Sequence, residues 1–136
     1  MKAQLLFIGA ALSVSACSGN TASINTNEFY APKIYADEAT LTISIPVEVG
    51  DKNGKKSFVK LFELYGFSGN GPSIEQVIKR NMAELTGTFD SEGDAFVVRV
   101  ASTEKLKAAL QKLKCVEDVK CLATWLKQSE SISGKE

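Results

Sequence analysis

The clearest pattern in the chain is a regular alternation of apolar and polar positions over residues 41–49. The apolar positions of this stretch are Leu41, Ile43, Ile45, Val47 and Val49. Alternation of this kind predicts a strand with one face buried and one face in water. The dipeptide Asn53-Gly54 follows, and it is typical of a two-residue hairpin turn. We therefore expect a second strand over residues 57–65, paired with the first so that Val49 lies opposite Phe58.

A helix and a second hairpin are predicted for the middle of the chain. Ser73 and Gln76 have the spacing of a capping box, and apolar residues at helical intervals predict a helix over residues 74–85. Residues 86–89 and 95–100 flank a polar turn, and we expect them to form two short strands joined as a hairpin.

Two further helices are predicted near the C-terminus. Ser102 or Thr103 is suited to the N-cap of the first. The apolar face of this helix comprises Leu106, Ala109, Leu110 and Leu113. After a break near Cys115, apolar residues at helical spacing from Val119 to Leu126 predict a last short helix. Trp125 lies at its apolar edge, and we expect it in the core or covering a disulfide.

Together these elements predict an α+β fold. Their order is β-β-α-β-β-α-α, an antiparallel sheet of about four strands (two hairpins) packed against two to three helices. The length of 136 residues suits one domain, which we place at residues 40–128. Residues 17–39 precede it as a polar tether and an aromatic lead-in, and residues 129–136 follow as a frayed polar tail.

The first 16 residues have the three parts of a secretory signal peptide. Lys2 provides the positive end, residues 5–12 the apolar core, and Ser15-Ala16 the small-residue exit. The apolar core is too short for a transmembrane helix, which needs about 20 apolar residues. The sequence Val14-Ser15-Ala16-Cys17 resembles the lipobox of bacterial lipoproteins, apart from valine where leucine is the most common residue.

The resemblance to bacterial lipoproteins implies that the Cys17 sulfur carries a diacylglycerol group and that a peptidase cuts directly before Cys17. The membrane is then a partner of the chain through this anchor. Ser18, rather than aspartate, follows the cysteine. In enteric-type bacteria that residue implies the outer membrane, with the domain facing the periplasm or the cell surface. The alternative is an ordinary secreted protein cleaved near Ala16.

The two remaining cysteines, Cys115 and Cys121, are expected to form a disulfide in an oxidising compartment. On one continuous helix, residues six apart differ by about 600° and lie on different faces. The disulfide therefore predicts a break between two helices at residues 116–118. Loss of residues 1–16 leaves 15 basic against 16 acidic side chains, so nothing favours nucleic acid, which needs a basic surface.

Several kinds of catalytic site are excluded or disfavoured. The chain has no histidine, which excludes Ser-His-Asp and Cys-His catalysis and most zinc sites. The segment Ser102-Thr103-Glu104-Lys105 matches the S-x-x-K motif of some acyl-enzymes, but companion motifs are missing and an N-cap explains Ser102. Ser57 and Lys60 have the same spacing, but on a strand they would point to opposite faces.

Two other motifs lack essential residues. Residues 50–57 are similar to a phosphate-binding loop, but the glycines are one residue too close and a strand is expected next, so we predict a hairpin turn. Asp90, Glu92 and Asp94 are similar to the start of a calcium loop, but Ala95 occupies its glycine position. We expect no cofactor, no metal site and no enzymatic activity.

Surface recognition is the function that remains. The candidate contact site is Tyr65, Phe67 and Asn70, because aromatics on a glycine-rich loop are typical of binding sites. The alternative is that Tyr65 and Phe67 close the open end of the sheet.

The expected function is that of a non-enzymatic lipoprotein that binds another envelope protein, for example in a secretion or other membrane machine. Small pilot lipoproteins of secretion systems are similar in size, lipidation and a single disulfide. One alternative is an exclusion or inhibitor lipoprotein that blocks a phage, plasmid entry or a host enzyme. Another is binding of a small ligand or a cell-wall fragment between sheet and helices.

Mass spectrometry of the protein from its native envelope tests the anchor. We expect the N-terminal peptide to begin at Cys17 and to carry a diacylglycerol and further acyl mass. An unmodified thiol at this residue, or processing elsewhere, would contradict the lipoprotein interpretation.

Overall fold

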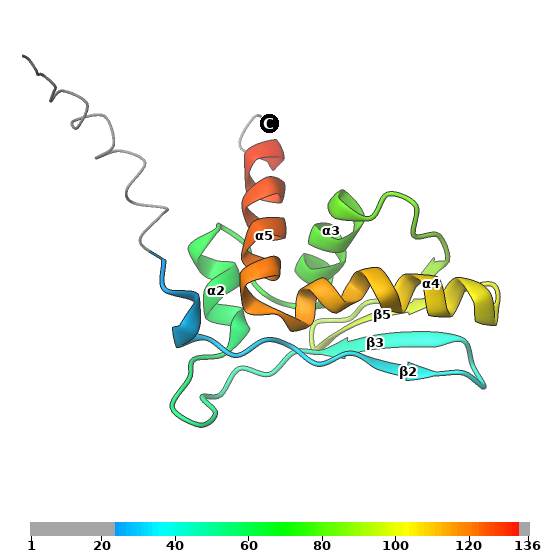
Figure 1. Ribbon diagram of the computed structural model, residues 1–136, viewed down its shortest axis with the longest axis horizontal. Coiled ribbons are helices and arrows are strands. Elements are labelled where there is room, and N and C mark those ends of the chain that lie inside the picture. The colour runs from blue at the N-terminus through cyan, green and yellow to red at the C-terminus, as the bar shows by residue number, and fades with distance from the viewer. Residues whose placement is uncertain (1–23, 134–136) are drawn as a thin grey trace, which may run out of the picture.

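The computed structural model describes residues 24–133 of the chain (Figure 1). Its helices and strands are β2 (Tyr35–Asp37), β3 (Thr42–Pro46), α2 (Phe58–Leu64), α3 (Gly71–Asn81), β4 (Thr88–Phe89), β5 (Ala95–Arg99), α4 (Thr103–Leu113) and α5 (Val119–Ser133). Two short 3-10 helices, η1 (Thr26–Glu28) and η2 (Lys114–Glu117), complete the elements. The predicted signal peptide, Cys17 and the first tether residues lie outside the described part of the chain.

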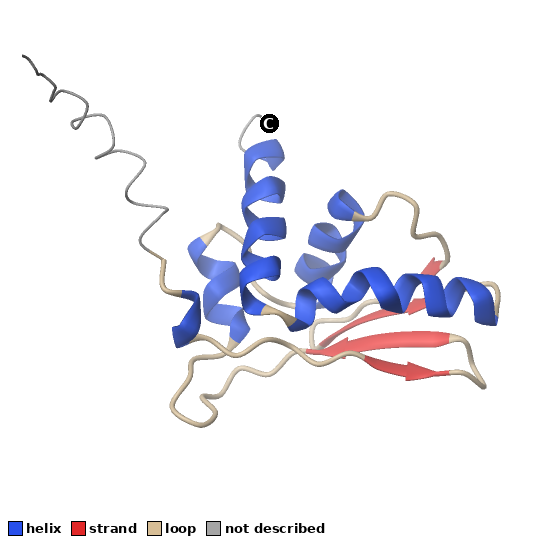
Figure 2. Ribbon diagram, viewed as in Figure 1, coloured by secondary structure: helices blue, strands red, loops and turns tan. Residues whose placement is uncertain are grey.

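The four strands form one antiparallel sheet in the order β2-β3-β5-β4. Two hairpins, β2-β3 and β4-β5, lie side by side because β3 pairs with β5. The helices lie on one side of this sheet and leave the other side open (Figure 2). The predicted α+β class with a four-stranded antiparallel sheet is therefore confirmed, although four helices pack with the sheet rather than two or three.

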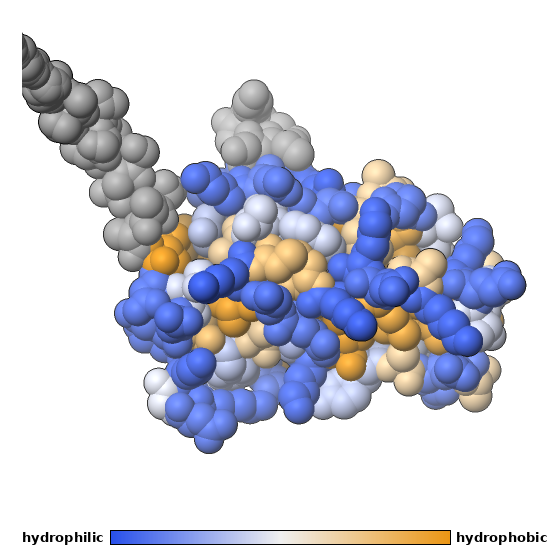
Figure 3. All heavy atoms as spheres, viewed as in Figure 1, coloured by the Kyte–Doolittle hydropathy of each residue, from blue (hydrophilic) through white to orange (hydrophobic). Residues whose placement is uncertain are grey.

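The core lies between the sheet and the helices. Its strand residues, all fully buried, are Ile43, Ile45, Phe96 and Val98. In the sheet register Ile43 is opposite Val98 and Ile45 is opposite Phe96, so apolar side chains meet across the central strand pair. Hydrophilic residues cover most of the outer surface in the view of Figure 3, with apolar residues between them.

The predicted strand over residues 57–65 is wrong, because this segment forms helix α2. The apolar residues Phe58, Val59, Leu61 and Phe62 are all buried on one side of it. Their spacing is that of a helix, and the choice of a two-residue period missed it. Ser57 begins the helix as N-cap, with its Oγ accepting a hydrogen bond from Val59 N at 3.0 Å.

The hairpin turn itself is present but short. Asn53 and Gly54 have positive φ angles of 52° and 78°, as a tight two-residue turn requires. Lys52 and Lys55 exchange both backbone hydrogen bonds across it, at 2.9 and 2.8 Å. The pairing does not extend into a second strand, because Ser57 already caps α2.

The strand that pairs with β3 instead comes from the predicted lead-in. Residues 35–37 form β2, and Phe29 is buried in the core. The backbone N–H of Ile34 donates to the Glu117 carboxylate at 2.8 Å, which ties the start of β2 to η2. The fold therefore includes residues that precede the predicted boundary at residue 40.

Helix α3 begins and ends earlier than predicted. Its N-cap is Asn70, whose side-chain oxygen accepts from Ser73 N at 2.9 Å, so Ser73 lies inside the helix rather than before it. The helix ends at Asn81 rather than at residue 85. Gly71 is required at its start because the β4-β5 turn passes so close to it.

The C-terminal region matches the prediction in part. Ser102 caps α4, with its Oγ accepting from Lys105 N at 3.2 Å. Cys115 and Cys121 form a disulfide with their Cα atoms 5.1 Å apart, and η2 provides the predicted break. The predicted tail is wrong over residues 129–133, because α5 continues to Ser133 and Ser129 is fully buried.

Gly71→Ala tests the close contact between α3 and the β4-β5 turn. An added Cβ would lie 1.9 Å from the Glu92 carbonyl oxygen and 2.2 Å from that of Ala95. We expect the free energy of unfolding, measured by urea denaturation, to fall by about 2 kcal/mol or more. Gly93→Ala is the matched control, since nothing lies within 4 Å of its added Cβ. Equal stability of the two variants would contradict this contact.

Candidate functional site

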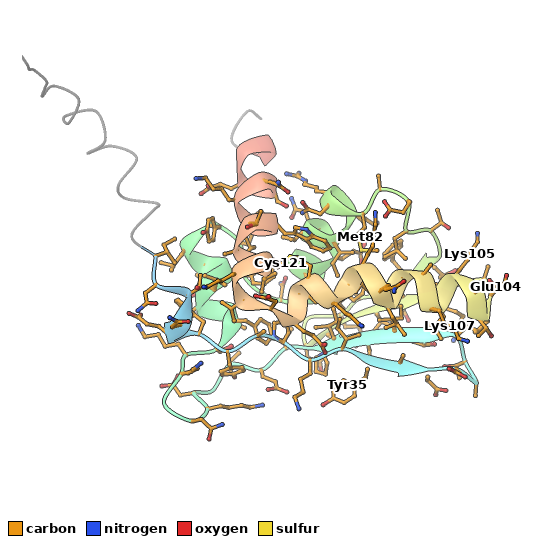
Figure 4. The ribbon with its side chains drawn as sticks, in the orientation of Figure 1. Tyr35, Met82, Glu104, Lys105, Lys107 and Cys121 are labelled. Atoms are coloured by element: carbon orange, nitrogen blue, oxygen red, sulfur yellow. A yellow bond between two sulfur atoms is a disulfide. The ribbon has the colours of Figure 1, made fainter. Side chains whose placement is uncertain are left out.

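A groove of about 800 Å³ lies between α4 and the segment that follows α3. Its lining residues are Met82, Glu84, Leu85, Thr86, Val100, Lys105, Ala108, Ala109, Gln111 and Lys112. Met82, from the segment that follows α3, and Lys105, from α4, are labelled in Figure 4. This volume falls within the range of ligand-binding clefts, about 300–1,000 Å³.

The sequence of α4 explains the shape of the groove. Lys105, Ala109 and Lys112 recur at helical spacing and line one side of it. Alanine in the middle leaves room that a longer side chain would fill. Met82 and Val100 are buried beneath and provide an apolar floor. The groove therefore combines an apolar centre with charged residues at its rim.

The two lysines at the rim differ in whether they form an ion pair. Lys112 forms an ion pair with Glu84, which joins the two walls of the groove. The hydrogen bond from Lys112 lowers the pKa of the Glu84 carboxyl below its usual value. Lys105 forms no side-chain hydrogen bond or ion pair with the described residues. One cation is thus left to interact with a negatively charged group of a bound molecule.

The open face of the sheet is a second surface. A hollow of about 310 Å³ on it is lined by Tyr35, Ala36, Asp37, Thr40, Thr42, Ser44 and Arg99. Tyr35 is 52% exposed and stands opposite Ser44 in the register. Small and polar residues are normal on the solvent face of an antiparallel sheet. This face therefore has a weaker claim to binding than the apolar groove.

The aromatic side chains of the predicted contact site are buried and do not form a binding surface. Tyr65 and Phe67 are only 7% and 9% exposed, and Phe67 packs against Phe62 with ring centroids 6.4 Å apart. Burial raises the pKa of the Tyr65 hydroxyl. Asn70 is occupied as the N-cap of α3. The two aromatics close the core beside α2, which corrects the proposal that they bind a partner.

The two S-x-x-K serines are both occupied by helix caps. Ser102 caps α4, as predicted. Ser57 and Lys60 lie on the same side of helix α2, so the argument from a strand does not hold for them. Ser57 is nonetheless fully buried, and its Oγ donates to the Glu48 carbonyl while accepting from Val59 N.

The remaining candidate residues belong to a turn or pack against the core. Asp90, Glu92 and Asp94 flank a tight turn that is closed by a bridge between Glu92 and Ala95. In residues 24–133 no group of three or more acidic or cysteine side chains is arranged to hold a metal ion. Trp125 is partly buried against the core.

Comparisons with protein families, with curated proteins and with solved structures find no match to this chain. Within the described range, none of the helices has the length and apolar character needed to cross a bilayer.

Sequence reasoning missed the groove. One signal was available, since Lys105, Ala108, Ala109 and Lys112 form a stripe on α4 beside its leucine face. The opposite wall carries no signal, because the apolar spacing predicts that helix α3 continues to residue 85, whereas it ends at Asn81.

The pKa of Glu84, measured by NMR titration, tests the link across the groove. Lys112→Gln should raise this pKa toward the ordinary glutamate value, while Lys105→Gln should leave it unchanged. Because the folded-state pKa is lowered, the contribution of the pair to stability is present above the unfolded pKa and is lost as pH falls through the folded pKa. A Glu84 pKa that is insensitive to Lys112→Gln would contradict the pairing.

Proposed function

We propose that this protein is a non-enzymatic lipoprotein, anchored at Cys17, that binds another envelope protein through the groove between α4 and residues 82–86. The observation that carries the proposal is the apolar floor of this groove beside Lys105, which has no ion-pair partner among residues 24–133. The matching partner presents apolar side chains to Met82 and Val100 and a carboxylate to Lys105. Apolar anchors surrounded by polar contacts are typical of protein interfaces.

The packing of the core favours a protein partner over a small ligand held between sheet and helices. Leu106 and Leu113 of α4 and Ile78 of α3 are fully or almost fully buried and fill that space. The groove lies outside this layer and is open along α4, so a surface of another molecule can reach it. Occupation of Ser57 and Ser102 by helix caps supports a function without covalent catalysis.

Site-specific photo-crosslinking in cells tests the groove. A photoreactive phenylalanine analogue at Gln111, which lines the groove, should give one discrete adduct in the membrane fraction. The same analogue at Lys107, which lies on α4 outside the lining, should not. Ala108→Glu places a bulky anion in the groove and should reduce the adduct at least about fivefold, the factor for a loss of about 1 kcal/mol in binding free energy.

Ser44→Glu provides the comparison, because it introduces the same side chain on the open sheet face, opposite Tyr35. It should leave the Gln111 adduct intact. Loss of the adduct with Ser44→Glu but not with Ala108→Glu would place binding on the sheet and contradict the groove. Mass spectrometry of the adduct separates a subunit of a membrane machine from an exclusion or inhibitor target.

A further inference from the structure

A hollow of about 340 Å³ lies at the end of the molecule where the described chain begins. It is lined by Tyr30, Ala31, Lys33, Glu48, Lys52, Asn53 and Lys55. Three of these residues are lysines, and all three are exposed. In Figure 1 the turn that carries Lys52 and Lys55 lies at the same end as η1, while the far end of α4 lies at the opposite end of the long axis.

Hydrogen bonds join the lysine-rich turn, residues 50–56, to residues 28–30, which follow the segment that leads to the anchor. Tyr30 N donates to Lys56 O at 2.9 Å, and Lys56 N donates to Glu28 O at 2.8 Å. The Tyr30 hydroxyl donates to the Gly50 carbonyl, and Lys52 Nζ lies 5.2 Å from the centre of the Tyr30 ring. These contacts hold the hollow against residues 28–30.

The length of chain between anchor and fold limits how far this end can lie from the membrane. Ile24, the first described residue, is the seventh residue after Cys17. Because an extended chain spans at most about 3.6 Å per residue, this separation is at most about 25 Å. Ile24 packs against the core, so the lipid anchor holds this end of the domain close to the bilayer.

The lining of the hollow carries more positive than negative charge. Glu48 is its acidic residue, and it forms an ion pair with Lys52. Lys33 and Lys55 form no ion pair or side-chain hydrogen bond with the described residues. Asp51 lies on the same turn and reduces the excess, but the two unpaired lysines remain available to an anion.

We propose that Lys33, Lys52 and Lys55 bind phosphate groups of anionic lipid headgroups in the membrane that carries the anchor, and so orient the domain with its groove away from the bilayer. Lysines beside an anchor are attracted to anionic lipid over distances of about a Debye length, about 8 Å at physiological salt. Tyr30 suits this position, because tyrosine is enriched at membrane–water interfaces. The inference rests on the lipid anchor of the proposed function.

Lysine reactivity on vesicles tests this orientation. The full lipidated chain is incorporated into vesicles of phosphatidylcholine, with or without phosphatidylglycerol, and acetylation of each lysine is followed by mass spectrometry. With anionic lipid, Lys33, Lys52 and Lys55 should react about fivefold more slowly, the factor for about 1 kcal/mol per lysine. Lys105 and Lys107 on α4 should react at unchanged rates.

Matched variants distinguish binding by the lysines of this hollow from a nonspecific effect of the total positive charge. Lys33→Gln/Lys55→Gln should abolish the protection of Lys52 on anionic vesicles. Lys105→Gln/Lys107→Gln, which removes the same charge at the other end, should leave the protection of Lys52 unchanged. Equal loss in both variants would show attraction without orientation and would overturn the proposal.

The remaining outcomes are also decisive. Protection of the same lysines by inorganic phosphate on neutral vesicles, with no further effect of phosphatidylglycerol, would show a site for free anions and overturn the lipid assignment. A chain that stays on the vesicles with no protected lysine would overturn the orientation but leave the proposed function standing. A full chain without affinity for vesicles would instead overturn the anchor itself.

Discussion

Burial of one face of the β3-β5 strand pair is the constraint on which the rest of the structure depends. Ile43 and Phe96 represent this face, which packs entirely under the helices. Because side chains alternate along a strand, the opposite row, with Ser44 and Arg99, must face away from the core. A shift of one residue would expose every apolar side chain of the strand, so the register and the open face have the same cause.

The position of α3 determines where the groove forms. Its N-terminus touches the β4-β5 turn at Gly71, where only glycine fits. Its last residue, Asn81, donates through Nδ2 to the carbonyl of Trp125 at 3.3 Å and to Oγ of Ser129 at 3.1 Å, both on α5. With both ends held, the chain must leave α3 at Met82, and the following residues become a wall facing α4.

The two proposed surfaces are separated along the molecule. The lysine-lined hollow lies at the end that begins at Ile24, and Lys105 lies near the start of α4 at the other end (Figures 1 and 4). A short link to a lipid anchor would hold the first end against the membrane. The groove would then face outward, where a partner protein can reach it. The two proposals therefore assign attachment and recognition to different residues.

The sequence by itself determined the features that depend on neighbouring residues: the alternating strand within residues 41–49, the cap at Ser102 and the helix break near Cys115. Tertiary structure decided which segment pairs with β3. Residues 57–65 satisfied the pattern of a strand roughly as well as that of a helix, and burial against the core selected the helix. Residues 35–37 are exposed and only three residues long, so their pairing had no local signal. The groove could not be predicted from the sequence either, because its walls come from segments that only tertiary packing brings together.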